Sequence, residues 1–374
     1  MELRPLDLGE IFDRAVTLYV QNFIAFTAIV LVTVVPVAIV QYLLILHELP
    51  ELNVSLALLA HPEHLGTQQV PSMFDSPTTL ALWVTSALVA YLMTTIALSA
   101  VGVGVARVYY GQRVDFAACY QPVLHRWWSL MALLGAALAM LIAAYVAAVL
   151  LMMIPIAIGL LSARSGFPVI LVLAVTVMLF VVLFAVLLVF MTSAFGFYGV
   201  VIERLPAFAA LRLAFARVFN RNDFSRALLC SIAVGVVWFA STVLFDSFGF
   251  VALARWPGAY VTLDALVRIV VSPLIAVILA LFYFDVRIRD EGFDLEVEME
   301  RPGGSAAEGD EPSYAPTAYL SGPERAMIKR FLERRDSLTV QRRQEIAAQL
   351  AAPLRERVPV EMRRLDDESL LERL

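Results

Sequence analysis

Few side chains in this sequence have the types and spacing that chemistry requires. His61 and His64 are two residues apart, a spacing that can bring two imidazoles to one metal ion. Metal sites usually need three or four ligands, and the sequence supplies no clear third one beside this pair. Pro62 also lies between them. We therefore expect no metal site and no cofactor.

Groupings typical of catalysis or nucleotide binding are missing as well. The sequence contains no Ser-His-Asp arrangement, no P-loop and no Cys/His cluster, so we expect no enzyme. Gly102 and Gly104 lie inside an apolar run without the third glycine of a dinucleotide motif. Ala100 and Gly104, four residues apart, fit close helix packing instead. Cys119 and Cys230 lie far apart in apolar surroundings and predict no disulfide framework.

The most notable charged stretch is residues 281–296, LFYFDVRIRDEGFDLE, at the end of the last apolar run. We interpret it as the last membrane helix entering the cytoplasm. Its motif residues are Asp285, Arg287, Arg289, Glu291, Gly292 and Asp294. We expect Arg287 and Arg289 to lie opposite Glu10 and Asp13 of the N-terminal helix.

Composition indicates a membrane protein. Of the 374 residues, 60% are hydrophobic and only 16% are charged, against about half and a quarter in soluble domains. The mean hydropathy is +0.79. The net charge of −5 comes from residues 285–374, because residues 1–284 are neutral overall. A neutral membrane part and an acidic tail argue against a nucleic-acid partner. The expected partner is the lipid bilayer.

Six apolar runs predict an all-α, polytopic membrane helical bundle in residues 1–296. The expected spans are about 23–46, 79–106, 129–161, 168–201, 224–245 and 265–284. Each can cross a hydrocarbon core of about 30 Å, at 1.5 Å per helical residue. The third and fourth runs are long, with Pro155 and Gly159 expected to bend or end the third. The path of residues 155–200 stays open between tall helices and re-entrant ends.

Three amphipathic stretches each precede a pair of spans. They are residues 7–22, 114–128 and 207–222. Helices of this kind lie at the membrane interface. The first has one alternative, an extension of the first span. Their regular order predicts a threefold structural repeat.

The arginine distribution predicts the orientation. Segments 1–22, 107–128, 203–226 and 287–301 hold 13 arginines, whereas 47–78, 162–167 and 246–268 hold 3. By the positive-inside rule, both termini are cytoplasmic in the plasma (inner) membrane of a bacterium. The first 22 residues carry acidic side chains among the apolar ones, which is not typical of a cleavable signal peptide.

The C-terminal part differs in composition. We expect residues 297–323 to be a flexible linker, because residues 301–323 are rich in Pro, Gly, Ser and Ala. Residues 324–374 predict a small cytoplasmic helical tail, with helices over 324–335 and 340–357, which is a possible docking surface for a protein partner. The alternative is a solvated charged tail.

Residues Leu6 to Phe23 and Tyr283 to Glu296 carry a resemblance to a known family. Over about 1–296 the chain resembles the membrane domain fused to some glycerophosphoryl diester phosphodiesterases, which also occurs as a stand-alone bacterial membrane protein. The resemblance implies a six-helix bundle. It implies no catalytic residues, because that chemistry belongs to a fused barrel of roughly 200 residues or more, for which residues 297–374 are too few. The tail is also similar to tails of some bacterial RDD-type membrane proteins.

Two functions are consistent with these patterns. We favour a non-catalytic membrane scaffold or accessory subunit, because the membrane runs are uncharged while the cytoplasmic end is charged and helical. The alternative is a transporter or lipid-handling protein for an apolar or lipid-like substrate. In that case hydroxyl groups would line the path of the substrate. The candidates are Thr94, Thr95, Ser99, Thr192, Ser241 and Ser272. A lipid-filled cavity between the spans would favour this alternative. Asp264 and Arg268 are spaced for a structural i,i+4 pair.

Overall fold

The computed structural model of the chain is helical. It describes residues 6–60, 76–162, 167–220, 223–291, 322–335, 338, 340–355 and 362–374, and these form helices and no strand. The all-α prediction is therefore confirmed. The chain divides into two compact units, one of Met1–Asp7 with Phe282–Leu374 and the other of Leu8–Leu281.

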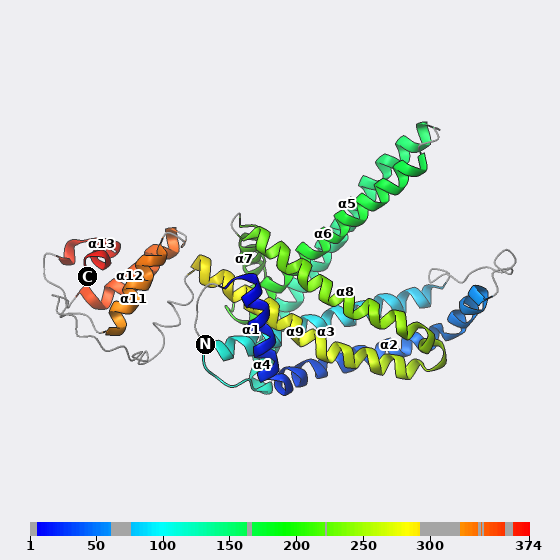
Figure 1. The fold of residues 1–374 in the computed structure, drawn as a ribbon, viewed down its shortest axis with the longest axis horizontal. Helices are drawn as coiled ribbons and strands as arrows, with labels where there is room; N and C mark the ends of the chain where they lie inside the picture. The colour runs from blue at the N-terminus through cyan, green and yellow to red at the C-terminus, as the bar shows by residue number, and fades with distance from the viewer. Residues whose placement is uncertain are drawn as a thin grey trace. The chain divides into compact units, whose positions relative to one another are not determined.

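Six of the described helices are long and apolar enough to cross a membrane (Figure 1). They are α2 (Phe23–Ala60), α3 (Pro77–Tyr109), α5 (Trp127–Ser162), α6 (Phe167–Val201), α8 (Phe224–Arg255) and α9 (Pro257–Glu291). This chain is a multi-pass membrane protein, and the prediction of a six-span polytopic bundle is confirmed.

Several helices continue beyond the apolar runs that identified them. The predicted polar connection 47–78 is helical up to Ala60, because α2 continues through Pro50. The predicted connection 246–264 is helical except at Trp256, where α8 gives way to α9. A polar side chain marks where a helix leaves the hydrocarbon, but the helix's backbone hydrogen bonds stay within the segment and need no apolar side chain.

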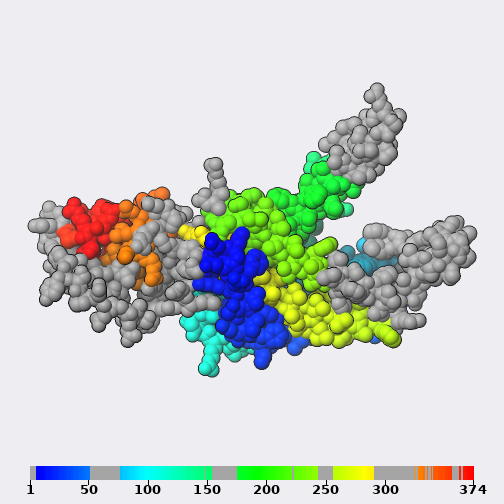
Figure 2. All heavy atoms as spheres, viewed as in Figure 1, coloured from blue at the N-terminus to red at the C-terminus, as the bar shows by residue number. Residues whose placement is uncertain are grey.

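Helices α5 and α6 pack against each other and are continuous. Helix α5 has 36 residues and α6 has 35, which corresponds to roughly 54 and 52 Å at 1.5 Å per residue. Helix α5 runs past Pro155 and Gly159 to Ser162, so neither residue ends it. Figures 1 and 2 show this pair projecting from the rest of the Leu8–Leu281 unit. Of the two alternatives, the structure therefore has tall helices and not re-entrant ends.

The order of a short helix before two long ones recurs three times. Helix α1 (Leu8–Gln21) precedes α2 and α3, α4 (Phe116–His125) precedes α5 and α6, and α7 (Ala207–Val218) precedes α8 and α9. This is the predicted threefold order of elements. Trp127 belongs to α5, so the second amphipathic helix is shorter than expected.

Helix α1 is a separate helix and not an extension of α2. A turn at Asn22 separates the two, and the Asn22 backbone and side-chain nitrogens donate to the Leu18 carbonyl at 3.2 and 3.1 Å. The apolar face of α1 is buried, with Ile11, Ala15, Leu18 and Tyr19 against the unit. The Tyr19 hydroxyl donates to the Val270 carbonyl of α9 at 2.9 Å, and α1 lies across one face of the unit (Figures 1 and 2).

Helices α4 and α7 are held by polar contacts at their ends. The Asp115 side chain caps α4 by accepting from the Ala118 backbone N–H at 3.0 Å. Arg217 of α7 is 5% exposed and pairs with Glu203, just after α6, at 2.7 Å. The second contact fixes α7 against the end of α6.

Close helix packing occurs at two glycines of α3, the predicted Gly104 and also Gly102, which the sequence pattern did not assign to packing. A Cβ atom on Gly102 would lie 2.3 Å from the Tyr198 ring, and one on Gly104 would lie 3.0 Å from the Phe26 ring. Tyr198 is fully buried and its hydroxyl donates to the Ala276 carbonyl at 3.1 Å. The absence of a side chain at residue 102 therefore lets one tyrosine connect α3, α6 and α9.

The C-terminal residues fold around a core of their own. Helices α11 (Gly322–Arg334), α12 (Val340–Arg355) and α13 (Asp367–Arg373) enclose buried side chains that include Phe331, Ile346 and Leu370. Helix α13 was not predicted from the sequence. Its signal is the N-cap residue Asp366, whose side chain accepts a hydrogen bond from the Ser369 N–H at 3.2 Å. Hydrogen bonds from the Ser369 side chain and backbone N–H hold the pKa of Asp366 below its ordinary value. The tail is thus a helical cluster and not a solvated segment.

Replacing Gly102 by alanine is expected to destabilise the bundle by roughly 1–3 kcal/mol, because the new methyl group overlaps the Tyr198 ring. The measurement is the thermal unfolding midpoint of the purified protein in detergent. The matched control is Gly135→Ala in α5, where an added Cβ meets nothing within 4 Å. It should leave the midpoint unchanged or raise it slightly. Equal melting of the two variants would contradict the packing argument.

Candidate functional site

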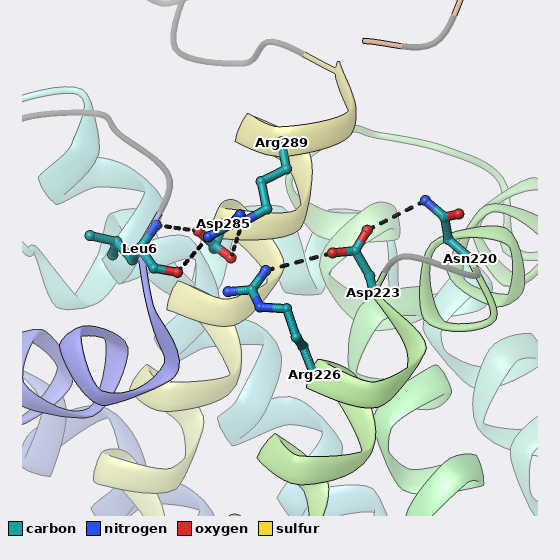
Figure 3. Close-up of polar contacts among 6 residues, drawn as sticks. All are labelled: Leu6, Asn220, Asp223, Arg226, Asp285 and Arg289. Carbon is teal, nitrogen blue, oxygen red and sulfur yellow. Dashed lines mark hydrogen bonds and ion pairs between the residues drawn. The ribbon is translucent and has the colours of Figure 1, made fainter. Parts of the chain in front are cut away.

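The predicted cytoplasmic motif centres on Asp285, which is 1% exposed. One carboxylate oxygen accepts from the Leu6 backbone N–H at 2.7 Å (Figure 3). The other accepts from Arg289 Nε at 3.1 Å, one helical turn further along α9. The Arg289 guanidinium also donates to the Leu6 carbonyl at 2.7 Å. Asp285 and Arg289 thus hold both backbone groups of Leu6.

These hydrogen bonds give the arrangement a structural role. Residues Leu279 to Phe284 are 0% exposed, so the turns of α9 that lead to Asp285 are buried on all sides. A buried carboxylate that accepts a backbone N–H and a guanidinium N–H has its charge balanced and its oxygens occupied. It therefore ties the N-terminal segment to α9.

The structure describes some of the remaining motif residues and not others. Arg287 is 8% exposed. Glu291 ends α9, while Gly292 and Asp294 lie outside the described residues. Glu10 and Asp13 are on α1, and Asp13 is exposed without an ion pair within the part of the chain that the structure describes. The partners of Arg289 are Asp285 and Leu6, and a pairing of Arg287 with Glu10 stays a prediction.

A second polar group lies within the Leu8–Leu281 unit, before and at the start of α8. Asp223 is 3% exposed and pairs with Arg226 at 3.6 Å and with the Asn220 amide at 3.4 Å (Figure 3). Its carbonyl accepts the Ala227 N–H at 2.8 Å, the first hydrogen bond of α8. This group starts a helix, and sequence analysis did not single it out.

The feature best suited to hold a ligand is a partly open cavity of about 150 Å³ between α2, α3, α6, α8 and α9. Its walls are mainly apolar, with Val34, Leu98 and Phe190 among the lining residues. Along α9 the lining runs from Asp264 to Ala276. At 1.5 Å per residue this corresponds to about 18 Å. The cavity is therefore elongated along the helices.

The predicted pair of Asp264 and Arg268 lies at one end of this cavity. Arg268 Nε donates to the Asp264 carboxylate at 2.7 Å, and Asp264 is 5% exposed, which confirms the pair. Arg268 is 37% exposed, and within the described residues its other guanidinium nitrogens have no partner. The arginine can thus donate hydrogen bonds to a ligand's polar end while Asp264 balances its charge.

Three of the six predicted hydroxyl groups line the cavity: Thr94, Ser241 and Ser272. Thr94 donates to Ala90 and Ser241 to Trp238, each at 2.8 Å and within its own helix. Donors used in this way leave oxygen lone pairs as weak acceptors on an apolar wall. Thr95, Ser99 and Thr192 do not line the cavity. Its aromatic walls, Phe190 and Trp238, were missed, because apolar periodicity does not distinguish a cavity wall from a lipid contact.

The described residues show no metal centre and no reactive thiol. No group of three or more His, Cys, Asp or Glu positioned for a metal ion occurs among them, and His61 and His64 lie outside them. Cys119 and Cys230 are free and buried. Burial raises the pKa of Cys119 to about 11, so its thiol stays protonated at neutral pH.

No family model, no curated protein and no solved structure matches this chain. Function must therefore be inferred from its own residues, and the resemblance over 1–296 stays a prediction.

Replacing Asp285 by alanine should destabilise the protein by about 1–3 kcal/mol, because the buried Leu6 N–H loses its acceptor. The loss of the Arg289 pair adds less, since that side chain is 32% exposed. The unfolding midpoint in detergent measures the effect. Asp13→Ala, which removes an exposed carboxylate from α1, is the control and should change the midpoint little. If Asp13→Ala were the more harmful change, the assignment of Asp285 as the tie would be wrong.

Proposed function

We propose that the protein binds an apolar or lipid-like molecule in the cavity between α2, α3, α6, α8 and α9, as a transporter or lipid-handling protein. The observation that carries this proposal is the cavity itself, apolar along its length and with Arg268 at one end. Such a combination suits a molecule with an apolar body and one polar group. The proposal assigns no catalytic step to any residue.

The size of the cavity limits what it can enclose. An apolar cavity of 150 Å³ accommodates about one benzene ring, and drug-sized ligands need roughly 300–1,000 Å³. The cavity therefore takes a ring or a short stretch of alkyl chain. The remainder of a longer molecule would extend through the open side between the helices.

The proposed setting is the plasma membrane of a bacterium, with both termini in the cytoplasm. The excess of arginines in segments 1–22, 107–128, 203–226 and 287–301 supports this orientation. The proposal retains the resemblance to the membrane domain associated with glycerophosphoryl diester phosphodiesterases, which agrees with a six-helix bundle and adds no chemistry.

Filling the cavity should weaken binding. Ala97 lines it and is 7% exposed. In Ala97→Phe, the new ring displaces about two methylene groups of the ligand, at about 0.8 kcal/mol each, so the affinity should fall about tenfold. The probe is a spin-labelled stearic acid added to the detergent-solubilised protein. The measurement is the immobilised component of its electron spin resonance spectrum.

The matched control is Ala87→Phe, which adds the same ring at an exposed position of α3. It should bind the probe as the wild type does. An unchanged melting temperature in both variants establishes that they fold. Equal immobilisation in the wild type and Ala97→Phe would overturn the proposal.

A second candidate function, the scaffold or accessory subunit, is supported by the core of the tail. Ten buried residues of the described tail form one cluster, which includes Phe331, Leu350 and Leu371. Ion pairs join α12 to α13, among them Arg355 with Asp367 at 2.7 Å and Arg343 with Glu368 at 2.8 Å. A folded cluster presents a fixed surface to a partner, which a solvated tail does not.

Phe331→Ala should unfold the tail, because deleting a buried phenylalanine costs about 3–5 kcal/mol and a core this small rarely supplies more. The measurement is trypsin digestion of sealed inside-out vesicles. If the tail is cytoplasmic, the variant's tail should be degraded rapidly and the wild-type tail slowly. A partner that binds this tail should co-purify with the wild type and not with Phe331→Ala.

The control is Val340→Ala, at a residue that is 65% exposed in the same tail, which should behave as the wild type. Protection of the variant's tail in inside-out vesicles, together with its cleavage in right-side-out vesicles, would show that the orientation is wrong. Recovery of a lone chain from every gentle purification would count against the scaffold.

A further inference from the structure

A second hollow, of about 540 Å³, lies between the ends of α3 and α6 and helix α4. It is distinct from the apolar cavity and shares no lining residue with it. Its lining includes Arg107, Arg126, Arg204 and His125. We call it the basic pocket, because three of its lining residues are arginines and none is acidic.

Two acidic residues that are close in sequence to the lining residues are already engaged elsewhere. Glu203, beside Arg204 in sequence, pairs with Arg217 at 2.7 Å. Asp115, before α4, caps that helix through the Ala118 N–H. Neither is a lining residue, so the positive charge of the pocket is not balanced from within its wall.

The three guanidinium groups are held in different ways. Arg107 Nε donates to the Arg113 carbonyl at 3.1 Å, and Arg126 Nη1 donates to the carbonyls of Arg204 and Leu205. These bonds to neutral carbonyls fix the arginines without cancelling their charge. The Arg204 guanidinium makes no hydrogen bond or ion pair within the described residues. Several N–H donors thus remain for an anion.

The backbone of Arg204 supports the same conclusion. Its φ is +60°, in the left-handed region, and it is the one described residue other than glycine with a positive φ. Such a conformation is disfavoured for a residue with a Cβ atom and recurs where a side chain is held for a ligand. The Arg126 bond to the Arg204 carbonyl stabilises it here.

The surroundings of the pocket have the character of a membrane interface. Leu124 of α4 is 65% exposed, Trp128 at the start of α5 is 83% exposed and Phe208 of α7 is 83% exposed. Large apolar side chains at the ends of spanning helices lie at the headgroup level of a bilayer, and tryptophan is enriched there. An anion in this pocket would therefore lie where lipid phosphates are concentrated.

We propose that the basic pocket is a binding site for a phosphate-bearing anion, with Arg107, Arg126 and Arg204 as its donors. Guanidinium groups match phosphate oxygens in geometry and stay charged at any physiological pH. A phospholipid headgroup and free phosphate share this chemistry. This inference does not rest on the proposed function, because it concerns a different pocket and a different ligand.

The experiment has one arm for each source of phosphate. In the first, the detergent-solubilised protein is equilibrated with equimolar phosphatidylglycerol and phosphatidylcholine, and native mass spectrometry counts the bound lipids. In the second, inorganic phosphate is titrated into the protein calorimetrically. Arg204→Gln should lower phosphatidylglycerol binding, phosphate binding or both by about tenfold, the loss expected for a charge-assisted hydrogen bond.

Two further variants separate a site from a general charge effect. Arg212→Gln removes an exposed arginine of α7 that does not line the pocket, so it changes the net charge equally. It should alter binding less than twofold. Arg204→Gly removes the charge and also accepts the positive φ, so this variant should bind as weakly as Arg204→Gln without loss of thermal stability.

Loss of phosphatidylglycerol binding alone identifies a lipid site, and loss of phosphate binding alone identifies a site for a soluble anion. Equal losses in Arg204→Gln and Arg212→Gln would overturn the proposal, because they would show unspecific attraction. Undiminished binding in Arg204→Gln and Arg204→Gly would overturn it as well. Failure of the Ala97→Phe test leaves these outcomes unaffected, so the two proposals fail separately.

Discussion

The bundle depends on close backbone contact at Gly102, because helices in lipid gain little by hiding apolar surface from one another. The Tyr198 ring occupies the space that a side chain at residue 102 would need, and its hydroxyl reaches the Ala276 carbonyl. One buried tyrosine therefore sets the spacing of α3, α6 and α9. Ala276 also lines the apolar cavity, so this contact lies at the end of that space.

Two more tyrosines in the described residues join helices in the same way, through a hydrogen bond from the hydroxyl group to a backbone carbonyl. The Tyr19 hydroxyl of α1 donates to Val270 of α9 at 2.9 Å, and the Tyr120 hydroxyl of α4 donates to Ile29 of α2 at 2.6 Å. A carbonyl in a helix keeps a second lone pair, so it can accept a side-chain donor without losing its helical bond. Burial raises the pKa of Tyr120 to about 12, which keeps this donor protonated. Helices α1 and α4 are thereby each fixed to a spanning helix by an uncharged donor, whereas α7 is held by the Arg217–Glu203 ion pair.

The sequence predicted the six spans but not the contacts between helices. Apolar runs predicted six spans, because a bilayer imposes length and composition on each segment separately. They did not predict where α2 or α9 ends, since a helix can continue in water once its polar side chains face out. The spacing of Asp264 and Arg268 predicted their pair, because both lie on one helix. The tie of Asp285 to Leu6 joins residues 279 positions apart, and no local pattern encodes such a distance.

The order of residues along α3 separates the two candidate sites. The apolar cavity is lined on this helix up to Leu98, and the basic pocket begins at Val103. Ser99 to Gly102 are buried between them, with Tyr198 packed on Gly102. A single phospholipid cannot place its phosphate in the basic pocket and its chain in the cavity while this layer is closed. The layer therefore separates the two sites along α3, and the packing of Tyr198 on Gly102 is one contact through which their ligands can be coupled.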